Sequence, residues 1–121
     1  MDEFPKAAAN QNEKLPQEVR DLISDLAAEV REVRAFMEER YATIKARSVD
    51  GKTPTLDTEH AEDALRILSY LRLSLTSAEL AGNTLLGQPK NKDAVMGARE
   101  LYRNLGRRHD DAKSAFAKLN I

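Results

Sequence analysis

The feature of this sequence that most restricts its fold is the spacing of its apolar residues, which recur at alternating steps of three and four along three long segments. An α-helix completes a turn in about 3.6 residues, so this spacing gathers the apolar side chains on one helical face. No proline interrupts any of the three segments. The pattern therefore predicts three long amphipathic helices.

Residues that start or stop a helix set the predicted helix ends. Pro16 suits a first helical turn, and Asn91 suits the capping position before one. Gly87 followed by Pro89 stops a helix, because glycine accepts the left-handed conformation and proline cannot continue the hydrogen bonding. The predicted helices cover residues 16–47, 57–86 and 92–120.

The short connections between these segments force neighbouring helices to run antiparallel. The predicted fold is all-α: residues 15–121 form a single domain, an up-down-up bundle of three long antiparallel helices, and residues 1–14 form a flexible arm. The layout resembles that of a spectrin-type repeat in architecture alone. The residues expected in the core are Val19, Ile23, Leu26, Val30, Val33, Met37 and Ile44; Ala61, Ala64, Leu68, Leu71, Leu75, Ala78, Gly82 and Leu85; and Ala94, Ala98, Leu101, Leu105, Ala112, Ala115 and Leu119.

Two arginines, Arg40 and Arg108, occupy positions where the apolar pattern expects a hydrophobic residue. Their long side chains can reach past the core to solvent, or they can form buried ion pairs that fix the alignment of the helices. The acidic residues expected at the same level of the bundle are Glu59, Glu62 and Asp63 for Arg40, and Glu29 and Glu32 for Arg108.

The composition excludes several classes of chemistry. The chain has no cysteine, which rules out disulfides, thiolate nucleophiles and cysteine-based metal sites. The formal net charge of −1 gives the whole molecule no attraction to nucleic acid or to an acidic membrane. The most apolar stretch, residues 64–86, contains Arg66, Arg72 and Glu79, so no membrane span is expected. A cytoplasmic location is expected, because the first residues do not resemble a secretory signal.

The second predicted helix carries more leucine than one core-facing stripe requires. Leu65, Leu73 and Leu80 point away from its core face, beside Thr76 and other small polar residues. Exposed leucines are costly, so we expect self-association through Leu65, Leu73, Thr76 and Leu80. The alternatives are that the other two helices enclose this helix more fully, or that the arm around Phe4 covers it.

The last third of the chain is basic, with eight lysines and arginines against four acidic residues between Gly87 and Ile121. Arg99, Arg103 and Arg107 recur every four residues and therefore form one basic ridge on the third helix. Such a ridge can contact phosphates of a nucleic acid. It can also face solvent or meet an acidic protein.

The chain has two histidines, and neither predicts a metal site or a cofactor. Carboxylate-rich helical bundles that bind two metal ions repeat Glu-x-x-His on paired helices. The nearest match here is a single Asp57-x-x-His60 at a helix start. His109 is in phase with Tyr102 and Phe116, which places it at the edge of the core.

The segment from Arg103 to His109 resembles the Arg-x(4–6)-His signature of HEPN-type ribonucleases, including the asparagine after the arginine. Those enzymes are small helical bundles that act as dimers, and the resemblance implies that Arg103 and His109 form an RNA-cleaving pair. On an unbroken helix, residues six apart lie about 120° apart around the axis. The pair would therefore need a break at Gly106 or help from a second subunit.

The sequence contains no glycine-rich phosphate loop, nucleophile elbow or paired catalytic acids, so an enzyme is not the leading hypothesis. The leading hypothesis is a non-enzymatic helical protein-interaction module. It would bind itself, another protein or both through the apolar strip on the second helix and the basic ridge on the third. The alternative is a nucleic-acid-binding protein that uses Arg99, Arg103 and Arg107, and the third reading is a HEPN-like ribonuclease.

Overall fold

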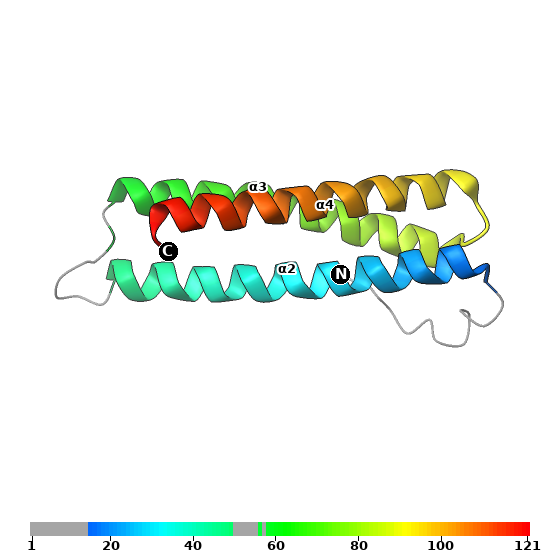
Figure 1. Cartoon of the computed structure of the whole chain (residues 1–121), viewed down its shortest axis with the longest axis horizontal. Coiled ribbons are helices and arrows are strands. Elements are labelled where there is room, and N and C mark those ends of the chain that lie inside the picture. The colour runs from blue at the N-terminus through cyan, green and yellow to red at the C-terminus, as the bar shows by residue number, and fades with distance from the viewer. Residues whose placement is uncertain (1–14, 50–55, 57) are drawn as a thin grey trace.

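The computed structural model describes residues 15–49, 56 and 58–121. The helices of this part of the chain are α2 (Gln17–Val49), α3 (Thr58–Gly87) and α4 (Lys92–Leu119), and it contains no strand. They lie lengthwise against one another, with α3 running back along α2 and α4 returning parallel to α2 (Figure 1). The predicted up-down-up bundle is confirmed. The predicted arm over residues 1–14 lies outside the described residues.

The helix ends fall within two residues of the predicted bounds. Asn91 caps α4 as expected, since its side-chain oxygen accepts hydrogen bonds from the backbone N–H groups of Asp93 and Ala94 at 2.9 and 3.2 Å. At the other end of α4, Asn120 adopts a left-handed conformation with φ of 63°, and its backbone N–H bonds to the carbonyl of Ala117. Satisfied end groups of this kind hold the two ends of α4 in place.

The core consists of the apolar stripes of α2 and α3 and a narrower stripe of α4. The predicted core positions of α2 are all buried, and those of α3 are buried except for Ala61, which is half-buried. Leu15 and Leu56, just outside the helices, are buried as well. The side chains with no exposed surface at all include Leu26, Val30, Val33, Leu68, Leu85 and Leu105.

The buried face of α4 differs from the predicted one. Ala98, Leu105 and Ala112 are buried as expected, but the remaining buried positions are His109 and Phe116. The other predicted core positions of α4 (Ala94, Leu101, Ala115 and Leu119) are only half-buried. The apolar spacing predicts that position 108 faces the core, where Arg108 interrupts the pattern. In the structure the residue that faces the core is the next one, His109.

Burial on α3 predicts the effect of removing single leucines. Leu71 is 1% exposed and Leu73 is 66% exposed, although they are two residues apart on the same helix. Leu71→Ala should lower the free energy of unfolding by about 2–5 kcal/mol, because it leaves a cavity in the core. Leu73→Ala should change it by less than about 0.5 kcal/mol. Urea denaturation in dilute solution measures both, and equal losses would contradict this packing.

Candidate functional site

The outer face of α3 carries a line of exposed apolar side chains. Leu65, Leu73 and Leu80 are 42%, 66% and 57% exposed, and Thr76 between them is half-buried. We call these four residues the leucine strip. The alternative that α2 and α4 enclose the leucine strip is wrong, and the alternative that the arm around Phe4 covers it concerns residues outside the described ones. None of the described helices combines the length and the apolar character that a membrane-spanning segment requires.

Two hydroxyl groups next to the leucine strip are satisfied by hydrogen bonds inside the chain. The hydroxyls of Ser69 and Thr84 donate to the carbonyls of Leu65 and Leu80, one helical turn earlier, at 2.9 Å each. Hydroxyls bonded in this way lose less when a partner covers them, because burial breaks fewer hydrogen bonds to water. At the edges of the strip, Arg66 pairs with Asp63 on α3, and Glu79 pairs with Arg34 on α2.

The basic ridge of α4 also lies at the surface. Arg103 and Arg107 are exposed, and Arg99 is half-buried. Arg99 lines a pocket of about 360 Å³ between the start of α2 and the start of α4. The charged residues that line this pocket are Lys90, Lys92, Arg99 and Glu18, and Val19 and Val95 line it as well. The pocket therefore favours an anionic group over a cationic one.

Arg40 contacts aromatic rings and the end of the chain, not the acids expected at its level. Its guanidinium lies 5.1 Å from the ring centre of Phe36 and 5.9 Å from that of Phe116. One of its terminal N–H groups donates to the main-chain oxygen of Ile121 at 3.0 Å. Of the two alternatives for Arg40, the ion pair with Glu59, Glu62 or Asp63 is therefore wrong. Arg40 instead joins α2 to the end of α4 through cation–π contacts and a hydrogen bond.

Arg108 does not pair with Glu29 or Glu32, so the buried ion pair is wrong for this residue and the alternative of a side chain that reaches solvent is confirmed. It is exposed, and it lines a pocket of about 180 Å³ with Ile67 and Tyr70 of α3. One residue further along α4 is about 100° further around the helix. The side chain that faces α2 at this level is consequently that of His109.

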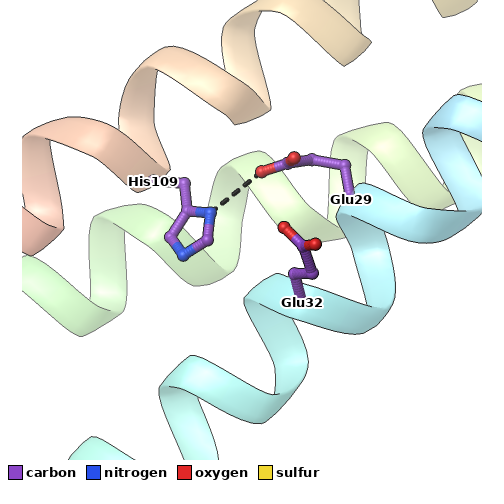
Figure 2. A group of neighbouring side chains, drawn as sticks. All are labelled: Glu29, Glu32 and His109. Atoms are coloured by element: carbon purple, nitrogen blue, oxygen red, sulfur yellow. Dashed lines mark hydrogen bonds and ion pairs between the residues drawn. The ribbon is translucent and has the colours of Figure 1, made fainter.

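His109 meets two glutamates of α2 near the middle of that helix. Its Nδ1 lies 2.9 Å from a carboxylate oxygen of Glu29, and its side chain is 8% exposed. Its ring packs against that of Phe36 in a T-shaped arrangement, with ring centres 5.1 Å apart and planes at 69°. Figure 2 shows the carboxylates of Glu29 and Glu32 directed into the same space as the imidazole. One ligand atom from each of the three residues lies within 4.8 Å of the others, which is close enough to hold a metal ion.

Sequence reasoning missed this group because its members come from opposite ends of the chain. His60, the histidine with acidic neighbours in the sequence, lies exposed in the first turn of α3. The available signal was the Glu29-x-x-Glu32 spacing, which places two carboxylates on one helical face. That signal predicts a site only once α4 is known to turn His109 toward α2.

The structure does not bring Arg103 and His109 together within one chain. Helix α4 continues without a break through Gly106. Arg103 is exposed, whereas His109 is buried against Glu29 and Phe36. The break that the HEPN resemblance would need at Gly106 is therefore not found.

The different contacts of Arg40 and Arg108 predict different effects when each arginine is replaced by leucine. Arg40→Leu should lower the free energy of unfolding by about 1–2 kcal/mol, because it removes two cation–π contacts and a charged hydrogen bond. Arg108→Leu, at an exposed position, should change it by less than about 0.5 kcal/mol. Thermal and urea unfolding of the two variants compare them directly. An Arg40→Leu variant as stable as the natural sequence would contradict the assigned role.

Comparison with known proteins does not add a relative: no family model, curated protein or solved structure matches this chain. Its function has to be inferred from the residues and contacts described above.

Proposed function

We propose that this chain is a non-enzymatic interaction module that self-associates through the leucine strip of α3. The observation that carries the proposal is the exposure of Leu65, Leu73 and Leu80 in one line on a helix whose opposite side fills the core. Exposed apolar side chains gathered on one face of a helix mark interaction sites. The satisfied hydroxyls beside the strip support the same conclusion, since covering them costs little.

A second copy of the chain fits the leucine strip because the strip is self-complementary. When two α3 helices pack antiparallel with their centres at residues 72 and 73, Leu65 of one copy lies level with Leu80 of the other. In the same arrangement, Ser69 lies level with Thr76. A two-fold symmetric contact requires this kind of correspondence between a surface and itself.

The strength of such a contact follows from the exposed area. The three leucines are 42–66% exposed, and full burial of a leucine stabilises by roughly 1.5–3 kcal/mol. A dimer that buries them on both copies gains roughly 5–10 kcal/mol. Association itself costs about 4–15 kcal/mol. The two terms are comparable, so we expect a reversible dimer whose population depends on protein concentration.

A charge in the leucine strip should abolish this dimer. Leu73→Glu places a carboxylate near the two-fold axis, where two copies would bring like charges together. Its matched control is Ala35→Glu, which introduces the same charge at an exposed position of α2. Sedimentation velocity over a range of concentrations should show a dimer for the natural chain and the control, and a monomer for Leu73→Glu. A natural chain that stays monomeric at every concentration would contradict the proposal.

The exposed guanidiniums of Arg103 and Arg107 favour a second candidate function, the binding of nucleic acid. If Arg99, Arg103 and Arg107 neutralise three phosphates of duplex DNA, the logarithm of the binding constant should fall with the logarithm of salt concentration at a slope of about −2.7. Replacing Arg103 and Arg107 by alanine should reduce that slope by roughly 1.8. Fluorescence anisotropy with a labelled duplex measures both slopes.

The control for this titration is Arg31→Ala, which removes an exposed arginine from α2 and should leave the slope unchanged. Absence of binding at low salt would eliminate this second function. A basic ridge that binds an acidic protein instead of nucleic acid would give the same negative result. Self-association through α3 would be unaffected in that case.

A further inference from the structure

We propose that Glu29, Glu32 and His109 bind a divalent transition-metal ion, with Zn²⁺ as the ion of best fit. The two glutamates lie one turn apart on the same face of α2, and His109 comes from the parallel helix α4 (Figure 2). The site therefore depends on the folded bundle. It is also separate from the leucine strip, which lies on α3.

The donor set favours a transition-metal ion over Mg²⁺ or Ca²⁺. It consists of one imidazole nitrogen and two carboxylate oxygens. Magnesium and calcium prefer oxygen ligands alone, whereas zinc accepts histidine and carboxylate together. Three protein ligands with one position left for water are an established arrangement for zinc.

The distances require only small side-chain movements. Around a tetrahedral zinc ion with bonds of about 2.0–2.2 Å, neighbouring ligand atoms lie about 3.4 Å apart. His109 Nδ1 and the Glu29 oxygen are now 2.9 Å apart, so their hydrogen bond would open by about half an ångström. The three ligand atoms lie within 4.8 Å of one another, and Glu32 is exposed and can rotate inward.

The surroundings hold the imidazole in position before an ion arrives. His109 is buried, and the edge contact with Phe36 fixes its ring plane. Phe36 is itself packed against Phe116, with ring centres 5.7 Å apart. A ligand whose rotamer is fixed by packing loses less entropy on binding.

Charge also favours a cation at this point. Of the arginines on this stretch of α2, Arg31 is exposed to solvent, Arg34 pairs with Glu79, and Arg40 bonds to Ile121. The two carboxylates therefore attract a cation that enters from the solvent side, where Glu32 is exposed.

Titration calorimetry of the whole chain with zinc chloride tests the site. We expect one ion per chain, and a rise of about 5–10 °C in the unfolding midpoint at a hundredfold excess of the ion over its Kd. Glu32→Gln should weaken binding at least tenfold without lowering the stability of the metal-free protein, because Glu32 is exposed. His109→Gln should weaken it further, and Glu32→Gln remains decisive if that variant folds poorly.

Two controls separate this site from adventitious binding. Glu38→Gln removes an exposed carboxylate on the opposite side of α2, and His60→Ala removes the other histidine. Both should leave the affinity for zinc unchanged. The proposal is overturned if zinc at millimolar concentration produces no saturable heat, or if Glu32→Gln binds as tightly as the natural chain. Neither result bears on dimer formation by α3.

Discussion

Burial of the apolar stripe of α3 is the interaction on which the rest of this structure depends. Its fully buried members, among them Leu68, Ala78 and Leu85, form a common core with α2 and α4. Each buried leucine stabilises the bundle by roughly 1.5–3 kcal/mol relative to an exposed one. With that side of α3 occupied, Leu65, Leu73 and Leu80 are left on its outer side. The surface available for a partner is thus a consequence of how the core is filled.

Polar and aromatic contacts align α2 with α4. Phe36 touches His109 and Phe116, and Arg40 lies over both phenyl rings. The hydrogen bond between His109 and Glu29 lies beside this group. At the end of the bundle, Arg47 donates to the main-chain oxygen of Asn120. These contacts are directional, so they fix how far α4 can slide or rotate along α2, which aliphatic packing alone specifies less strictly.

The sequence was sufficient to predict the fold because apolar spacing and turn residues act locally. Gly87, Pro89 and Asn91 ended one helix and began the next where expected, and the core positions of α2 were all found buried. The level of the bundle at which α4 meets Glu29 and Glu32 was also predicted correctly. The rotation of α4 was not, because Arg108 and His109 both fit an alternating three- and four-residue pattern. His109 is the residue that faces α2, because an imidazole bonded to Glu29 can be buried more readily than a guanidinium. The candidate metal site and the contacts of Arg40 could not be predicted for the same reason.

The central claim is that the outer face of α3 meets the same face of a second copy, and cysteine cross-linking tests it most directly. The chain contains no cysteine, so single cysteines can be introduced without background. With a short thiol-reactive linker, Leu73→Cys should give covalent dimers, whereas Ala35→Cys on α2 should not. A mixture of Leu65→Cys and Leu80→Cys chains should cross-link more than either variant alone, since antiparallel packing brings these positions together. Equal cross-linking at positions 35 and 73, or none at position 73, would contradict the account.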